Sequence, residues 1–167
     1  LRPNVLITMA TSPELFDKNH AINFIKLVEK YLIVNNCIGI RSLDYTDNEY
    51  DGIYDMNNDG NDYKNAIGFN NHNGPEFIWL NCYYFLAKIL FNEYSNQEQL
   101  FYDLNKKLSL FEKYIKDDKW SGLPGFTNKN GSFCEGSCGT SLSSIGLLIE
   151  VLYELCKIKT SFNHNIN

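Results

Sequence analysis

The spacing of hydrophobic residues predicts a chain built mainly from helices. Apolar residues recur every three or four positions over residues 20–34, 97–116 and 140–157, which places them on one helical face. A shorter helix is expected over residues 3–10. Residues 75–94 are apolar nearly all round, which is typical of a helix buried on every side. The pattern predicts helical hairpins in which buried and half-buried helices alternate.

Two long polar segments, residues 41–73 and 120–139, separate these helices. No stretch alternates apolar and polar residues between turns, so we expect an all-α fold without a sheet. Long irregular segments in a compact domain are usually functional or disordered, and the aromatic residues in these two favour ordered, functional loops. We expect one domain over residues 1–158 and a disordered tail over residues 159–167.

Composition excludes several classes of protein. The chain has 167 residues, of which 44% are hydrophobic, too many for a disordered chain. Its 15 Lys and Arg residues against 20 Asp and Glu residues lack the clustered basic surface of a nucleic-acid binder. The most apolar run, residues 77–91, is too short for a membrane span and contains Asn81 and Lys88. Five cysteines, an odd number, favour free thiols in a reducing compartment, and thus a cytoplasmic protein.

Two motifs have both a structural and a functional interpretation. The run from Asp55 to Gly60 resembles the first half of a calcium loop, but Ala66 stands where the bidentate Glu should be, so we expect no metal site and no cofactor. His72 and Glu76 flank a Gly-Pro turn before the most apolar helix. That turn is either a helix cap, with Pro75 and Glu76 in the first helical turn, or a place where substrate hydroxyls are recognised.

Several short sequence blocks occur in the order and with the spacing found in a known protein family. They lie at residues 1–4, 12–16, 39–44, 52–55, 72–79, 120–124, 127–128, 134 and 137–138. Together they resemble the C-terminal, amylo-α-1,6-glucosidase portion of eukaryotic glycogen debranching enzymes. The resemblance implies a partial (α/α)6 barrel and inverting hydrolysis of α-1,6-linked glucose at glycogen branch stubs. It also implies glycogen or limit dextrin and the remainder of a debranching-enzyme chain as partners. Charge and hydropathy, as above, give the expectation of neither nucleic acid nor membrane as a partner.

The departures from the family pattern bear on catalysis. Gly125 stands where the resemblance places the general base, and the family's acid lies in a region before Leu1. Asn71, Asn73 and Leu80 replace the family's Tyr, Gln and Pro, and residues 141–144 replace its Gln-Ala-Trp-Ser. A general acid or base contributes about 10²–10⁴-fold in rate, so we expect no catalytic residue in this chain and no activity from the chain alone. Glu135 is a possible replacement base that the sequence leaves open.

A second interpretation is a sugar cleft without catalysis. We expect its substrate-binding residues to be His72, Glu76, Trp79, Trp120 and Asn128. Three hypotheses follow: a piece of a debranching enzyme, a non-catalytic carbohydrate-binding pseudo-enzyme, and a remnant helical fragment. An incomplete barrel is expected to leave the apolar surface of residues 77–91 exposed.

Overall fold

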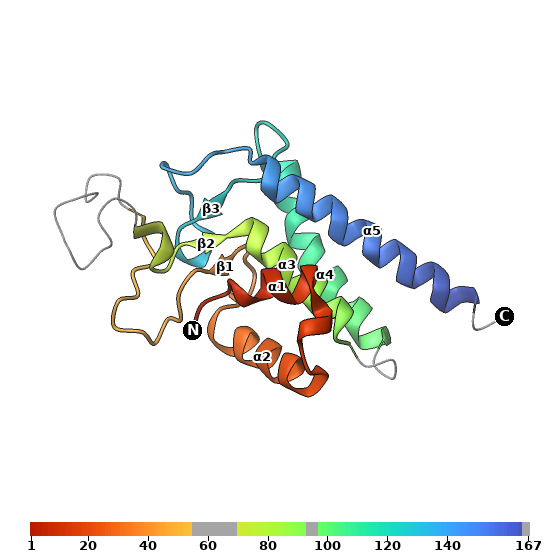
Figure 1. Cartoon of the computed structure of the whole chain (residues 1–167). Helices are drawn as coiled ribbons and strands as arrows, with labels where there is room; N and C mark the ends of the chain where they lie inside the picture. The colour runs from red at the N-terminus through yellow and green to blue at the C-terminus, as the bar shows by residue number, and fades with distance from the viewer. Residues whose placement is uncertain (55–69, 93–96, 165–167) are drawn as a thin grey trace.

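The structure is a computed structural model that describes residues 1–54, 70–92 and 97–164. The described part of the chain is mostly helical, which confirms the helical class predicted from the hydrophobic spacing. Helix α3 (Ile78–Leu90) lies at the centre of the molecule (Figure 1), and α1 (Val5–Thr11) and α5 (Leu142–His164) pack against it. These contacts link the two ends of the chain through one central helix.

The amphipathic helices α2 (Lys18–Tyr31) and α4 (Gln97–Asp117) also join this core. Asp17 caps α2 by accepting the His20 backbone N–H at 3.0 Å, so the helix begins a little before the predicted start at residue 20. It also ends before the predicted end at residue 34. Helix α4 meets α3 where the rings of Phe85 and Phe111 lie 5.8 Å apart in an edge-on contact. The stripe of apolar residues therefore faces the core, as its spacing predicted.

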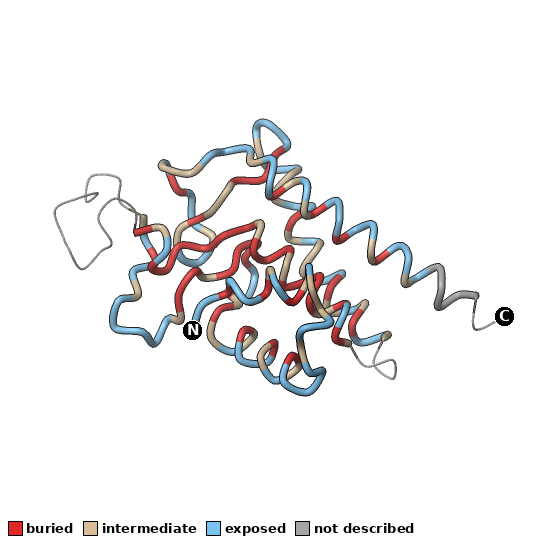
Figure 2. Tube along the Cα trace, in the orientation of Figure 1, coloured by how far each residue is buried: buried red, intermediate tan, exposed pale blue. Residues whose placement is uncertain are grey.

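Helix α3 is buried on nearly every side, as predicted. Its buried residues are Ile78, Leu80, Asn81, Cys82, Tyr84, Phe85, Leu86, Ala87 and Ile89. The expectation that an incomplete barrel leaves residues 77–91 exposed is wrong for nearly all of them, because the neighbouring helices of this same chain cover them, and Leu90 alone of this run is exposed. Part of the exposed apolar surface lies on α5, which extends past the rest of the molecule (Figure 2).

The start of α3 differs from the prediction. Residues 76–77 are extended, and the helix begins only at Ile78, after Phe77 at its N-cap position. The interpretation of Pro75 and Glu76 as the first helical turn is therefore wrong. The reason is that the backbone of Glu76 and Phe77 pairs with two other segments, and this pairing requires an extended conformation.

Those three segments form a small antiparallel sheet, which corrects the expectation of a fold without one. Its strands are β1 (Ile40–Arg41), β2 (Glu76–Phe77) and β3 (Phe126–Thr127), in that order. Each strand is two residues long, too short to show the alternation that identifies a strand in a sequence. The sheet lies at the N-terminal end of α3, and it draws together the two polar segments (Figure 1).

The rest of the polar segments follows short turns. Single 3-10 turns occur at Asn70–His72 and Lys129–Gly131, and a third, Pro13–Leu15, follows α1.

Helix α5 continues through residues 159–164, where the sequence predicts a disordered tail. No helix in the described ranges has the length and apolar character that a membrane span needs. All five cysteines lie within the described ranges, where no disulfide joins them, and Cys37, Cys82 and Cys134 are buried thiols.

Candidate functional site

The sheet sorts its side chains onto two faces. The register pairs Glu76 with Arg41 on one side and with Thr127 on the other, so these polar residues share one face. Phe77 pairs with Ile40 and with Phe126 on the opposite face. A line of polar groups, drawn from three distant parts of the chain, thus crosses one side of the sheet and an apolar line crosses the other.

Glu76 has the central position on the polar face and is completely buried, with 0% of its surface exposed. One carboxylate oxygen, Oε1, accepts the backbone N–H of Asn130 at 2.8 Å, and Oε2 accepts that of Gly131 at 3.1 Å. The Thr127 hydroxyl donates to Oε2 at 3.4 Å. Asn130 and Gly131 have φ angles of 61° and 70°, so two successive N–H groups in a turn form a small concavity that binds an anion.

Burial raises the pKa of the Glu76 carboxyl from 4.5 to about 7, because the protein interior disfavours the charge. The two N–H donors and the nearby Arg41 guanidinium act in the opposite direction but do not cancel this effect. Burial, with a smaller contribution from the Glu76 charge, also raises the pKa of the neighbouring Cys37 thiol to about 11. Cys37 is therefore a protonated thiol at neutral pH and not a nucleophile.

Two glycines permit this arrangement. A Cβ at Gly39 would lie 2.6 Å from Cβ of Glu76 and 2.9 Å from its carbonyl oxygen, so only glycine allows the chain to pass there. Gly74 has a φ of 150°, and a Cβ there would lie 2.4 Å from the carbonyl oxygen of Asp51. The Gly-Pro turn noted in the sequence is thus a point of close backbone approach just before Glu76.

His72 and Trp79 meet through the apolar face of the sheet. The His72 ring stacks on Phe77, with centroids 5.9 Å apart, and Trp79 contacts the same ring edge-on at 6.0 Å. Phe77 in turn lies 5.4 Å from the ring of Phe126. His72 is exposed and Trp79 half-buried, so this aromatic cluster reaches the surface.

Asn128 joins two loops through its side-chain amide. Its Oδ1 accepts the Tyr54 backbone N–H at 2.8 Å, and its Nδ2 donates to the Phe133 carbonyl at 3.2 Å. The next residue, Lys129, donates its backbone N–H to the Gly52 carbonyl at 2.7 Å. The half-buried Asn128 amide is therefore held in one orientation between residues 52–54 and the turn that binds Glu76.

Trp120 lies in a tight turn and is 75% exposed. The Asp118 carboxylate accepts the backbone N–H groups of Trp120 at 2.9 Å and Gly122 at 3.1 Å, and Ser121 between them has a φ of 52°. The Lys119 ammonium lies 5.5 Å from the Trp120 ring. These contacts hold the Trp120 backbone and leave its ring open, and they do not join it to the aromatic cluster.

Gly125 lies where α3, β3 and the loop before α5 meet. Its N–H donates to the Cys138 carbonyl at 3.0 Å, and its carbonyl accepts the Ile78 N–H at 3.2 Å. A Cβ here would lie 3.7 Å from Oγ of Ser137 and 3.9 Å from Cβ of Ser141, which are ordinary contacts. The backbone at Gly125 would therefore accept a side chain, unlike the backbone at Gly39.

Arg2 is a site residue that the sequence analysis did not single out. Its guanidinium donates to the carbonyl oxygens of His72 and Ser42, and it lies 3.5 Å from Oδ1 of Asn73. The Ser42 hydroxyl accepts the Gly74 N–H at 2.9 Å, so the same few residues hold the turn from both sides. Arg2 belongs to a sequence block that carries the resemblance, but nothing in its local spacing connects it to His72.

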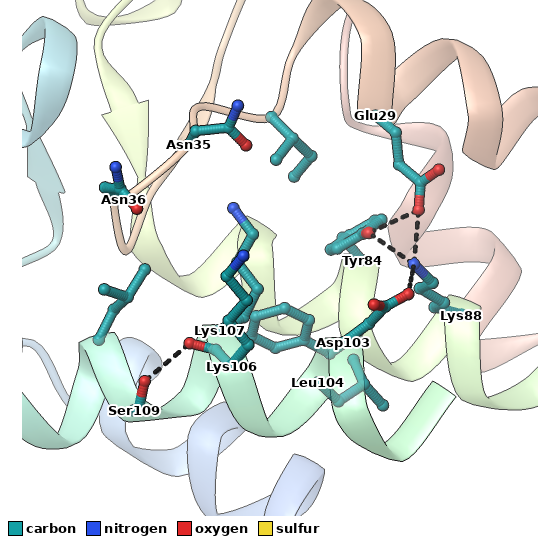
Figure 3. A pocket seen from close by; sticks show the side chains of 13 residues that line it. Glu29, Asn35, Asn36, Tyr84, Lys88, Asp103, Leu104, Lys106, Lys107 and Ser109 are labelled. Atoms are coloured by element: carbon teal, nitrogen blue, oxygen red, sulfur yellow. Dashed lines mark hydrogen bonds and ion pairs between the residues drawn. The ribbon is translucent and has the colours of Figure 1, made fainter. Parts of the chain in front are cut away.

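A separate pocket of about 720 Å³ lies between α2, α3 and α4 (Figure 3), and none of the predicted site residues line it. Lys88 lies at one end of this pocket, 2.7 Å from Glu29 and 3.6 Å from Asp103. The Tyr84 hydroxyl donates to Glu29 at 2.8 Å. These side chains pair opposite charges with one another, so this end of the pocket is a satisfied polar network between helices.

The structure shows no metal site in the part of the chain that it describes, where no group of three or more His, Cys, Asp or Glu side chains is suitably placed. The calcium-like run from Asp55 to Gly60 lies outside the described residues.

Comparison with known proteins agrees with the resemblance carried by the sequence blocks. The sequence pattern of the amylo-alpha-1,6-glucosidase family matches residues 1–150. The glycogen debranching enzyme of Saccharomyces cerevisiae (strain ATCC 204508 / S288c) is 32% identical over 166 residues, an alignment that covers 93% of this chain. The chain spans only 11% of the length of that enzyme. The matches cover β1, β2 and β3 together with the helices around them, and on this basis the chain belongs to the amylo-alpha-1,6-glucosidase family.

Proposed function

We propose that this chain is part of a glucosidase barrel that hydrolyses α-1,6-linked glucose at glycogen branch stubs, and that the chain alone does not hydrolyse it. Family membership supports the reaction class. The observation that supports inactivity of the chain alone is Gly125, which has no side chain at the position where the resemblance places the base. Glycine cannot accept a proton or hold a water molecule through a side chain.

Inverting hydrolysis needs two carboxyl groups on opposite sides of the bond. One protonates the leaving oxygen and the other activates a water, and the two lie about 6.5–9.5 Å apart to leave room for that water. The proposed position of the second is occupied by Gly125, next to the hydroxyls of Ser137 and Ser141. The first carboxyl, like the helices that complete the (α/α)6 barrel, would come from the remainder of a debranching-enzyme chain.

The predicted binding residues have different roles in this proposal. Trp120 offers an open ring on which the apolar face of a glucose unit can stack, and His72 and Trp79 provide a second aromatic surface. Asn128 offers an amide held in a fixed orientation. Glycogen or limit dextrin in the cytoplasm would be the substrate.

A chimeric enzyme tests the role of Gly125. The matching segment of the Saccharomyces cerevisiae debranching enzyme is replaced by this chain, carrying Gly125, Gly125→Glu or Gly125→Gln, and glucose release from phosphorylase limit dextrin is measured. We expect Gly125→Glu to release glucose at least about 10²-fold faster than the unaltered chimera, as expected for a restored general base. The glutamine in Gly125→Gln matches glutamate in size but cannot take a proton, so this chimera should remain inactive.

Equal glucose release by the chimeras with Gly125 and Gly125→Glu would contradict this placement of the base. Glu135→Gln then identifies a replacement base, since Glu135 is exposed in the loop two residues before Ser137. Thermal melting of each chimera provides the folding control.

A second candidate function is carbohydrate binding without catalysis, which the exposed and backbone-anchored Trp120 favours. Co-sedimentation of the 167-residue chain with glycogen tests it. Trp120→Ala should abolish most of the binding, whereas Tyr102→Ala removes an aromatic ring that is 65% exposed on α4 and should not. Equal losses in both variants would indicate non-specific adhesion.

A further inference from the structure

We propose that Glu76 is the positioning residue of the candidate site: its carboxylate holds the Lys129–Gly131 turn, and through that turn the Asn128 amide, and it does not contact sugar itself. The part that concerns sugar rests on the proposed function, whereas the hold on the turn does not. This assigns to Glu76 a role different from the substrate contact expected from the sequence.

The surroundings of the carboxylate support a structural role for its charge. Both oxygens accept backbone N–H groups, the Thr127 hydroxyl adds a third donor, and no part of Glu76 is exposed. Gly39 passes so close to the Glu76 Cβ that even a methyl group would not fit between them. Because no part of Glu76 is exposed, a sugar hydroxyl could reach the carboxylate only if the residues that cover it moved.

The turn transmits the position of Glu76 to the rest of the site. Asn128 and Ser132 are joined by a hydrogen bond from the Asn128 N–H to the Ser132 carbonyl at 2.9 Å, which closes the turn next to Gly131. Lys129 and Asn128 then bind the backbone of Gly52 and Tyr54. One buried carboxylate thus lies under the contacts that set the orientation of the Asn128 amide.

The charged and titratable groups around Glu76 come from three segments. Arg41 approaches from β1, Cys37 from the turn before it, and Tyr50 from the loop after it. The Arg41 guanidinium donates to the Tyr31 carbonyl at 3.2 Å and stacks on the Tyr45 ring, so its direct contacts are elsewhere. The carboxylate therefore depends on the two N–H groups of the turn as its closest partners.

A buried carboxyl whose pKa is near 7 also has the properties of a general acid. A general acid, however, must come within hydrogen-bond reach of the proton acceptor, directly or through one water. Glu76 lies under the turn, with its oxygens already occupied. Its burial therefore favours positioning over proton transfer.

The test combines amide NMR with sugar binding on the full 167-residue chain. In the unaltered chain, the amide protons of Asn130 and Gly131 should shift downfield together as pH rises through about 7, because the ionised carboxylate is a stronger acceptor for both. In Glu76→Gln the shifts should lose this titration, and hydrogen-exchange protection of at least one of the two amides should fall at least about tenfold. Glu98→Gln, an exposed change on α4, should alter neither.

Binding of phosphorylase limit dextrin, measured by calorimetry on the same proteins, separates positioning from contact. We expect the dextrin affinity of the unaltered chain to change with the same pH midpoint as the two amide shifts. The Glu76→Gln variant should bind dextrin more weakly and show no pH midpoint. The Glu76→Asp variant should restore part of the affinity and part of the amide titration. Loss of binding in Glu76→Gln with unchanged Asn130 and Gly131 amides would overturn the proposal, since Glu76 would then touch the sugar.

The two proposals can fail separately. Absence of dextrin binding in every protein would remove the proposed function, while the amide titration would still decide whether Glu76 holds the turn. Absence of both a common titration and hydrogen-exchange protection at the two amides of the unaltered chain would overturn the hold itself. That last measurement needs no substitution, so a variant that fails to fold does not prevent it.

Discussion

At the scale of single residues, Glu76 illustrates how burial changes a side chain that the sequence presents as an ordinary acid. Its position after a Gly-Pro turn suggests a helix cap or a substrate contact, and both interpretations assume access to solvent. The structure buries it between Arg41 and Thr127 in the sheet and supplies two backbone donors from more than fifty residues away. No local sequence signal reports such a donor pair.

The burial of Glu76 predicts a pH dependence of stability. Because the folded-state pKa, about 7, lies above the value of 4.5 for an unperturbed glutamate, the folded chain keeps a proton that the unfolded chain has lost between these pH values. The contribution of Glu76 to the free energy of unfolding is thus full below pH 4.5 and is lost as pH rises to 7, a change of about 3 kcal/mol.

Urea unfolding of the unaltered chain and of Glu76→Gln from pH 5 to 8 measures this change. The free energy of unfolding of the unaltered chain, relative to that of the variant, should fall as pH rises through this interval. A constant difference between the two proteins would show that the carboxyl does not titrate in the folded state. Comparing the two removes the contributions of the other carboxylates.

At the scale of elements, the sheet depends on how closely β1 and β2 approach each other. Gly39, just before β1, leaves no room for a Cβ against Glu76 of β2. Gly39→Ala should therefore lower the free energy of unfolding by about 1–3 kcal/mol, the usual cost of overpacking. Thermal and urea unfolding measure the loss.

Gly139→Ala is the matched control, because a Cβ at Gly139 has no atom within 4 Å. It should change stability by less than about 0.5 kcal/mol. If Gly39→Ala is as stable as Gly139→Ala, the strands can move apart without cost, and the sheet does not hold the site.

At the scale of the whole molecule, α5 carries exposed apolar side chains on its outer face. Leu142 is 86% exposed, Ile149 61% and Tyr153 58%, and their spacing of seven and four residues places them along one side of the helix. Figure 2 shows much of this helix as exposed up to residue 159. Apolar surface gathered in this way favours association between molecules.

We expect the chain to self-associate through this surface of α5 in solution. The mass measured by light scattering should rise with concentration for the unaltered chain, and the variant Ile149→Lys with Tyr153→Lys should stay near 19.3 kDa. Tyr102→Lys, which adds a charge at another exposed aromatic residue, should associate like the unaltered chain. A constant mass for the unaltered chain would show that exposure on α5 is too scattered to drive contact.

Part of this protein follows from local sequence alone. The apolar stripes of α2, α4 and α5 and the apolar surround of α3 are readable because helical periodicity repeats within a few turns of the same segment. The family is readable because its blocks keep their order along nearly the whole chain. The orientation of α3 toward a buried centre follows from the same pattern, since no polar face is available to meet water.

The arrangement of the site depends on contacts between distant segments. Two-residue strands have no hydrophobic period that a sequence could show. The strands β1, β2 and β3 form because residues 40, 77 and 126 come together around the start of α3. The same meeting buries Glu76, raises its pKa and fixes Asn128, while Trp120 remains in a turn of its own. Burial and pairing are properties of neighbours in space, and for these residues the neighbours are far apart in the chain.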